Sequence, residues 1–230
     1  MAEIVLALDL PTGPEAMRLL ERVPGTPWVK IGSMLMTREG APLVRALTAR
    51  GHRVFLDLKW HDIPNTVAGA VRAARELGVA MATVHALGGR TMMEAAAEAA
   101  GGDMSLVGVT VLTSHDPASY ARAVGREDVS LAEEVTRQAA EVVGAGLAGV
   151  VCSPAEIAGV RGVLPDHAIV VVPGIRSRAD AAGDQVRIAT AAEAAAAGAT
   201  HLVVGRPVLQ ATDPAAMLAR LTLEAGCEPS

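Results

Sequence analysis

Short apolar runs alternate along the chain with longer segments in which apolar residues recur at helical spacing. Eight of the apolar runs have the length and composition of β-strands and are bounded by turn residues. Nearly continuous apolar strands indicate a sheet covered on both faces, as parallel sheets are. The eight strands are predicted at residues 4–10, 27–32, 53–59, 81–86, 105–112, 148–152, 168–173 and 201–205.

Segments rich in Ala and Leu separate these runs and predict helices. A last helix is expected from about residue 213 to 225, because Asp213 can cap it and Pro214 suits the first helical position. Between the strands, segments such as residues 38–50, 66–77, 91–100, 130–144 and 187–197 have helical spacing.

Repeated strand–helix units of this number favour the α/β class and a (β/α)8 TIM barrel, with residues 1–230 as one barrel domain. A doubly wound sheet is the structural alternative. Such a sheet usually has a Gly-x-Gly-x-x-Gly turn after its first strand. Here the turn runs from Asp9 to Gly13 as Asp-Leu-Pro-Thr-Gly, so the fingerprint is absent.

Composition excludes several classes of protein. Hydrophobic residues make up 51% of the chain, which is ample for a large core. A net charge of −5 without a basic tract argues against nucleic acid as the partner. No apolar run reaches membrane-spanning length and no signal peptide is evident, so we expect a cytoplasmic protein. Cys152 and Cys227 suggest neither a disulfide framework nor a zinc site, and Cys152 reads as a small buried hydrophobe.

The two lysines draw attention to one end of the predicted barrel. Of the 20 basic residues, 18 are arginine, and only Lys30 and Lys59 are lysine. Both stand near the carboxyl end of a predicted strand, where barrel enzymes have their active sites. A lysine can be tuned to release its proton, whereas an arginine keeps its proton. The lysines therefore mark the expected centre of the chemistry.

Carboxylates accompany these lysines. Side chains alternate along a strand, so Asp57 and Lys59 are expected on the same face, pointing into the barrel mouth. Lys30, Asp57, Lys59 and Asp62 form a neutral set that can alternate in sign, with an attraction of roughly 4 kcal/mol per pair at 4 Å. Such an array would hold Lys59 protonated and aimed, as a general acid requires. The structural alternative is a simple ion pair at the barrel mouth, with Asp62 capping the following helix.

Two late segments predict an anion site. Gly205-Arg206 ends the eighth strand, and the seventh strand leads into Pro173-Gly174-Ile175-Arg176. Barrels commonly bind phosphate at these two loops, where Gly admits backbone N–H groups and Arg supplies a charged fork. A single Gly-Arg pair is more often a turn with a surface arginine. Two such segments in these loops favour phosphate binding, with the loop after the seventh strand as a lid.

Two further candidates have more than one interpretation. Asp9, at the end of the first strand, either binds a sugar hydroxyl or caps the turn at Pro11-Thr12. His85 has no carboxylate at ligand spacing, which favours a structural histidine over a metal ligand or base. No pair of histidines indicates a zinc or iron site, so no metal is expected.

At these residues the chain resembles orotidine 5′-phosphate decarboxylases of the bacterial type. The most specific string is Asp57-Leu58-Lys59-Trp60-His61-Asp62-Ile63-Pro64-Asn65-Thr66. The likeness extends from residue 4 to about residue 214. Further matching strings are Ala7-Leu8-Asp9, Val29-Lys30-Ile31-Gly32, Thr83-Val84-His85-Ala86, Val111-Leu112-Thr113-Ser114, Pro173-Gly174-Ile175-Arg176, Asp184-Gln185-Val186-Arg187 and Val204-Gly205-Arg206.

The resemblance implies a homodimeric barrel with shared active sites that converts orotidine 5′-monophosphate into UMP without a metal or organic cofactor. It implies that Lys59 protonates C6, that Asp57 crowds the departing carboxylate, and that Lys30 orients Asp57. Asp62 and Thr66 would reach the ribose bound in the partner's site. The other implied substrate contacts are Asp9 to the ribose, Thr113 to the pyrimidine, Pro173 and Arg176 in the closing loop, and Gln185, Gly205 and Arg206 to the phosphate.

Two competing functions stay open. Sugar-phosphate decarboxylases and aldolases that share an Asp-x-Lys-x-x-Asp strand are similar, but they use Mg²⁺ and need a further acidic ligand. The second strand carries Lys30 without a Glu before it, which counts against them. A nucleotide-phosphate binder without catalysis is disfavoured because both lysines and both aspartates are present.

Overall fold

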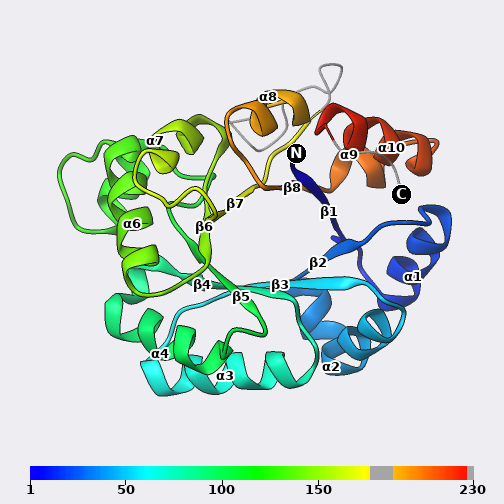
Figure 1. The fold of residues 1–230 in the computed structure, drawn as a ribbon, viewed down its shortest axis with the longest axis horizontal. Coiled ribbons are helices and arrows are strands. Elements are labelled where there is room, and N and C mark those ends of the chain that lie inside the picture. The colour runs from blue at the N-terminus through cyan, green and yellow to red at the C-terminus, as the bar shows by residue number, and fades with distance from the viewer. Residues whose placement is uncertain (177–188, 227–230) are drawn as a thin grey trace.

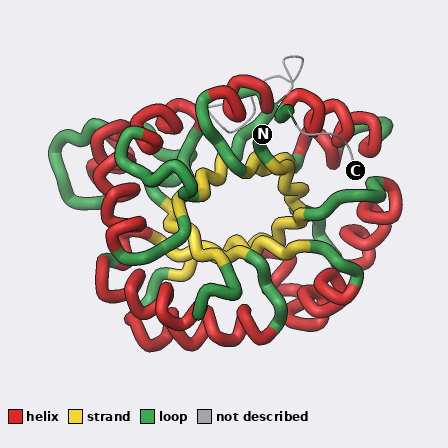
Figure 2. Tube along the Cα trace, viewed as in Figure 1, coloured by secondary structure: helices red, strands yellow, loops and turns green. Residues whose placement is uncertain are grey.

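The chain folds as a closed barrel of eight parallel strands, in the order β1 to β8, surrounded by helices (Figures 1 and 2). This computed structural model describes residues 1–176 and 189–226. All eight predicted strands are confirmed. Their bounds are β1 Glu3–Ala7, β2 Trp28–Gly32, β3 Arg53–Trp60, β4 Met81–His85, β5 Ser105–Val109, β6 Gly149–Val151, β7 Ile169–Val172 and β8 His201–Val204.

Helices connect successive strands and form the outer layer in Figure 2. The first five are α1 Gly13–Arg22, α2 Ser33–Ala49, α3 Pro64–Glu76, α4 Arg90–Ala100 and α5 Pro117–Ala123. The others are α6 Leu131–Gly144, α7 Ile157–Arg161, α8 Ala191–Ala196, α9 Arg206–Leu209 and α10 Pro214–Glu224, with 3₁₀ turns η1 Ala86–Gly88 and η2 Pro154–Glu156. The predicted cap of α10 is confirmed, since Asp213 accepts a hydrogen bond from the Ala216 amide. The four helices α1, α5, α7 and α9 lie outside the predicted set.

Apolar side chains inside the barrel form a floor beneath the strand ends. This inner cluster includes Trp28, Phe55 and Met81, each at most 2% exposed. Two positions further along the same strands stand Lys30, Asp57 and Thr83, as the alternation of side chains requires. A polar layer therefore rests directly on an apolar one, at the carboxyl ends of β2, β3 and β4. The inner cluster consists of Val5, Ala7, Trp28, Phe55, Met81, Val107, Val171 and Val203.

The pairing of β3 with β4 is irregular near the carboxyl end of β3. Leu56 is opposite Ala82, but Trp60 is opposite Val84, so β3 uses two more residues than β4 over this stretch. Lys59 lies in this irregular stretch of β3, between Leu56 and Trp60, and has a backbone φ of 51°. Among the described residues it is the one non-glycine residue with positive φ, a conformation that L-residues disfavour.

A buried carboxylate joins the two helices that follow β5. Glu134 of α6 accepts hydrogen bonds from Tyr120 of α5 at 3.1 Å and from Arg137 at 2.7 Å. The Glu134 side chain is 7% exposed. Its pKa is lowered to about 2, chiefly by the hydrogen bond from Arg137. The network fixes α5, and with it the loop that carries Thr113.

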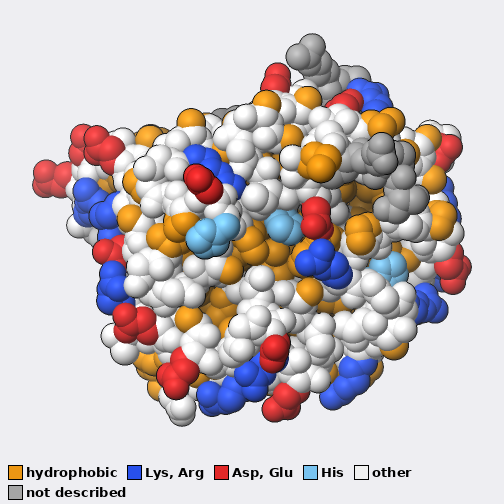
Figure 3. Space-filling model, viewed as in Figure 1, with side chains coloured by type: hydrophobic (Ala, Val, Ile, Leu, Met, Phe, Trp, Pro, Cys, Tyr) orange, Lys and Arg blue, Asp and Glu red, His pale blue; other side chains and the backbone are white. Residues whose placement is uncertain are grey.

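Charged side chains of both signs are interspersed around the periphery of the face in Figure 3, and hydrophobic side chains show near its centre beside a few charged and histidine side chains. Within the described ranges, no helix is sufficiently long and apolar to cross a membrane.

Candidate active site

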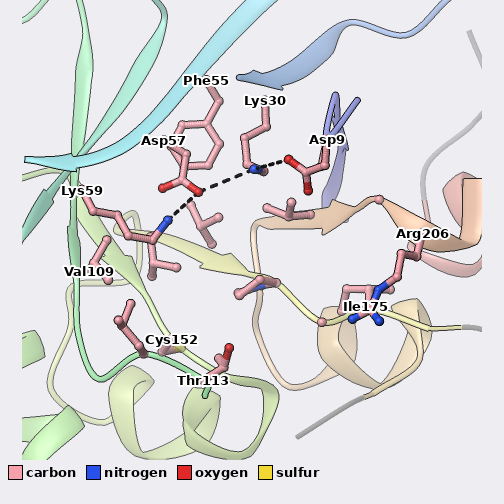
Figure 4. A pocket seen from close by; sticks show the side chains of 18 of the residues that line it. Asp9, Lys30, Phe55, Asp57, Lys59, Val109, Thr113, Cys152, Ile175 and Arg206 are labelled. Carbon is pink, nitrogen blue, oxygen red and sulfur yellow. Dashed lines mark hydrogen bonds and ion pairs between the residues drawn. The ribbon is translucent and has the colours of Figure 1, made fainter. Parts of the chain in front are cut away.

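A cavity of about 510 Å³ opens at the carboxyl ends of the barrel strands (Figure 4). Phe55 lies at its floor, and residues from most of the strand ends form its walls. Nine of the residues predicted from the sequence line this one cavity. They are Asp9, Lys30, Asp57, Lys59, Thr113, Pro173, Arg176, Gly205 and Arg206.

Four of these residues form a chain of alternating charges along one wall. Asp57 Oδ2 lies 2.8 Å from Lys59 Nζ and 3.7 Å from Lys30 Nζ, and Lys30 Nζ lies 3.1 Å from Asp9 Oδ1 (dashed lines in Figure 4). The two inner side chains, Lys30 and Asp57, are 11% and 15% exposed, whereas Lys59 is 38% exposed. The ammonium of Lys59 therefore combines a fixed partner with access to the cavity.

The neighbouring strands β2 and β3 bring Lys30 and Asp57 together. Gly32 is opposite Asp57 in the parallel register. A Cβ atom on Gly32 would lie 3.3 Å from Lys30 Nζ and 3.6 Å from Asp9 Oδ1. Gly32 therefore leaves room for the Lys30–Asp9 pair, a role that the sequence reasoning missed.

Thr83 is a second residue that the sequence reasoning did not assign. Its hydroxyl accepts a hydrogen bond from the Lys59 amide at 2.8 Å and donates one to Asp57 Oδ1 at 3.1 Å. The residue is fully buried. The signal available in the sequence was the one hydroxyl side chain of β4, at an inward position two residues after Met81 and two before His85.

The opposite side of the cavity is formed by the ends of β7 and β8. Arg206 is the first residue of α9, immediately after Gly205, and in Figure 4 it lies across the cavity from Lys59. Arg176, which follows β7, also lines the cavity and is 7% exposed. Gln185, the third residue predicted to bind phosphate, lies outside the described residues.

Asp62 and Thr66 do not join the other site residues within this chain. Both are exposed and absent from the cavity wall. Within this single chain, Lys30 pairs with Asp9, and the Asp62 carboxylate lies apart from the array. Asp62 does not cap α3 either, because the N-cap is Ile63 and the Asp62 carboxylate accepts a hydrogen bond from the amide of the next residue, Ile63, at 2.6 Å. The N-cap of α1 is Thr12, and the Asp9 carboxylate pairs with Lys30.

His85 has a structural position at the edge of the site. Its Nδ1 accepts a hydrogen bond from the Leu87 amide at the start of η1, and its ring stacks on His61 with centroids 5.5 Å apart. Burial, followed by the nearby His61 and Lys59, lowers the pKa of His85 to about 4. The imidazole of His85 is therefore neutral at physiological pH.

Cys152 lines the cavity but is 1% exposed. Burial, and to a smaller extent Glu156, raises the pKa of its thiol to about 12. The thiol is therefore protonated at physiological pH and packs as a small apolar group, as predicted. Among the described residues no three His, Cys, Asp or Glu side chains are arranged to hold a metal ion.

A closed (β/α)8 barrel with a charged cavity at the carboxyl ends of its strands defines a TIM-barrel enzyme for a small charged substrate. Residues 2–221 match the Orotidine 5'-phosphate decarboxylase / HUMPS family. The chain belongs to that family and is a carboxy-lyase, which confirms the resemblance found in the sequence.

Similar proteins support this assignment along the whole chain. An "Orotidine 5'-phosphate decarboxylase" of Halorhodospira halophila is 51% identical over 229 residues, covering 96% of this chain and 94% of the relative. One from Alkalilimnicola ehrlichii is also 51% identical and covers 97% and 96%. The crystal structure of orotidine 5'-phosphate decarboxylase from Lactobacillus acidophilus has a TM-score of 0.88 at 32% identity, covering 99% and 100% of the two chains.

Proposed function

We propose that this protein removes the C6 carboxylate of orotidine 5′-monophosphate to give UMP and CO₂ in pyrimidine biosynthesis, without a metal or organic cofactor. One observation carries the proposal. Lys59 and Asp57 lie at one side of the cavity and Arg206 at the other, which suits a substrate with its reacting carbon and its phosphate at opposite ends. The names of the similar proteins support the same substrate.

The Lys59–Asp57 pair performs the chemistry in this proposal. The substrate carboxylate enters beside Asp57, whose negative charge is fixed by contacts with Lys59 and Lys30. Repulsion between two carboxylates is relieved as the C6–carboxylate bond breaks and neutral CO₂ leaves. The electron pair of that bond stays on C6 and takes a proton from the Lys59 ammonium. Lys59 and Lys30 both line the cavity, but the Lys59 side chain is 38% exposed and that of Lys30 only 11%.

Groups on the other walls bind the parts of the substrate that do not react. Arg206 and the backbone at Gly205 bind the phosphate, with Gln185 as a further contact, and Arg176 and Pro173 belong to the closing loop. Thr113 contacts the pyrimidine, while Asp9 and Lys30 contact the ribose. Binding energy from the phosphate serves catalysis when it holds C6 against Lys59 in the transition state.

A homodimer with shared active sites accounts for Asp62 and Thr66. Both residues are exposed, outside the cavity of their own chain, on the rim where β3 leads into α3. A large exposed hydrophobic side chain follows each of the neighbouring strands β2, β3 and β4 within three residues. They are Met34, Ile63 and Leu87, which are 53%, 67% and 41% exposed. A second copy packed on this rim would cover them and would bring its Asp62 and Thr66 to the ribose.

The test is the loss of orotidine 5′-monophosphate ultraviolet absorbance with EDTA-treated protein, with Lys59→Ala assayed alongside. Turnover by the wild type alone supports a metal-independent decarboxylase with Lys59 as its acid. Absence of turnover, together with activity on a sugar phosphate after addition of Mg²⁺, would transfer the chain to the metal-dependent relatives. The cytoplasmic location and the absence of a nucleic-acid partner stay predictions from the sequence.

A further inference from the structure

Thr83 occupies the middle of β4, opposite the irregular stretch of β3. Its side chain points into the barrel, one layer above Met81, and is fully buried beneath the charged array. The hydroxyl lies 2.8 Å from the Lys59 amide nitrogen and 3.1 Å from Asp57 Oδ1. It thus contacts the backbone of one residue of the proposed reactive pair and the side chain of the other.

The chemistry of the two neighbours fixes the direction of both hydrogen bonds. A backbone amide can only donate, and an ionised carboxylate can only accept. The Thr83 oxygen therefore accepts from Lys59, and the Thr83 proton points to Asp57. The two carboxylate oxygens of Asp57 have different partners. Oδ1 accepts the hydrogen bond from Thr83, and Oδ2 faces the ammonium groups of Lys59 and Lys30.

The irregular pairing explains why a side chain is needed at this point. In a regular parallel ladder, the amides of one strand donate to carbonyl groups of the next. Between the Leu56–Ala82 and Trp60–Val84 pairs, β3 has surplus residues, and the Lys59 amide donates to the Thr83 hydroxyl instead. Lys59 also has a left-handed backbone conformation, which an L-residue keeps only when its surroundings hold it.

We infer that Thr83 is a positioning residue for decarboxylation, whose hydroxyl locks the left-handed turn at Lys59 to the carboxylate of Asp57. Loss of that hydroxyl frees the Asp57 carboxylate to rotate and removes the partner of the Lys59 amide. The distance from the Lys59 ammonium to the reacting carbon then varies, although every charged group is still present. This inference rests on the proposed role of Lys59 as the acid.

The decisive variants are Thr83→Val, which keeps the shape of the side chain but removes the hydroxyl, and Thr83→Ser, which keeps the hydroxyl. We expect Thr83→Val to lower kcat for orotidine 5′-monophosphate by about 10- to 100-fold, the effect of losing a hydrogen bond to a charged group. Thr83→Ser should restore kcat to within about threefold of the wild type, because the hydrogen bonds re-form. KM and the dissociation constant of UMP should stay within about threefold, since the phosphate-binding wall is untouched.

A matched control separates positioning from general stability. Thr26 is also buried, at 4% exposure, and its hydroxyl donates to the Val23 carbonyl, in the turn that precedes β2 at the opposite end of the barrel. Thr26→Val should lower the melting temperature without changing kcat. If Thr83→Val does not fold, Thr83→Ser and Thr83→Cys form a second pair of similar size, and the weakly hydrogen-bonding thiol should give a kcat about tenfold below that of the serine variant.

Three results would overturn the inference: wild-type kcat in Thr83→Val, equal kcat in the serine and cysteine variants, or a loss of UMP affinity as large as the loss of kcat. Lys59→Ala measured in the same series keeps the two proposals apart. Full activity of Lys59→Ala would refute the acid role itself. An inactive Lys59→Ala beside a fully active Thr83→Val would refute only the role of Thr83.

Discussion

Lys59 Nζ donates a hydrogen bond of 2.8 Å to Asp57 Oδ2, although the two residues are only two positions apart on the same strand. Regular alternation alone would place their side chains parallel. The left-handed backbone at Lys59 and the surplus residues in β3 accompany their direct contact. The pair is therefore a product of a local departure from strand geometry, and its function depends on both partners.

Removal of the Lys59 ammonium is expected to abolish turnover without unfolding the barrel. Lys59→Ala should lower kcat by at least about 1000-fold, within the range that a positioned general acid contributes. The side chain is 38% exposed and belongs to no core cluster, so the melting temperature should change little. Steady-state kinetics and thermal unfolding monitored by circular dichroism test both parts. Lys59→Arg is the matched control, and it should also be inactive because a guanidinium keeps its proton. If either variant kept one tenth of the wild-type kcat, that result would contradict the role of Lys59 as the acid.

Mixing two inactive variants tests whether the active site is shared. Asp62→Ala and Lys59→Ala homodimers should each be inactive, but a mixed dimer contains one site with both residues intact. Random exchange between equal amounts should restore about one quarter of the wild-type activity, because about half of the dimers are mixed and each has one complete site. Subunit exchange is verified by native mass spectrometry of a tagged partner. Verified exchange with no recovered activity would place Asp62 and Lys59 in the same subunit's site or outside catalysis.

Arg206 is expected to act through the phosphate of the substrate. Arg206→Ala should lower kcat/KM for orotidine 5′-monophosphate by about 10- to 100-fold, the cost of losing a charge-assisted hydrogen bond. The same variant should turn over orotidine, which has no phosphate, as the wild type does. Arg220→Ala is the control, since Arg220 forms an exposed pair with Glu224 at 2.9 Å in α10. An equal loss with both substrates would mean that Arg206 supports the fold of the β8 end and not the phosphate.

Glu134 gives the fold a dependence on acid pH. Because its pKa is lowered from 4.5 to about 2 in the folded protein, its contribution to stability is complete above pH 4.5 and is lost as the pH falls through about 2. Glu134→Gln should be less stable than the wild type by about 1–3 kcal/mol at pH 7, and the difference should shrink towards pH 2. Urea unfolding at several pH values measures it. A difference that is constant from pH 7 to pH 2 would show that the charge of Glu134 is not responsible.

The architecture and most of the site were predictable because both depend on local patterns. Apolar runs with turn residues at their ends placed all eight strands, and the carboxyl ends of those strands and the loops after them supplied nine of the residues that line the cavity. Short helices such as α7 and α9 were missed because five and four residues are too few to show helical periodicity.

The relationships between strands were the part that local patterns do not contain. The register of β3 against β4 depends on packing across the sheet, so the bulge, the left-handed Lys59 and the bridge through Thr83 could not be read from spacing. The same limit applies to the pairing of Lys30. Its closest carboxylate, Asp9, is 21 positions away in sequence and follows β1, which lies beside β2 in the closed barrel.

The two extra residues of β3 relative to β4 also limit how this active site could be transferred to another barrel. Copying the tripeptide from Asp57 to Lys59 onto a recipient strand would transfer the charges without their geometry. The recipient would also need a neighbouring strand that is shorter by two positions and presents an inward hydroxyl at that gap. The smallest portable unit is thus a pair of adjacent strands, and a designer would have to graft β3 and β4 together.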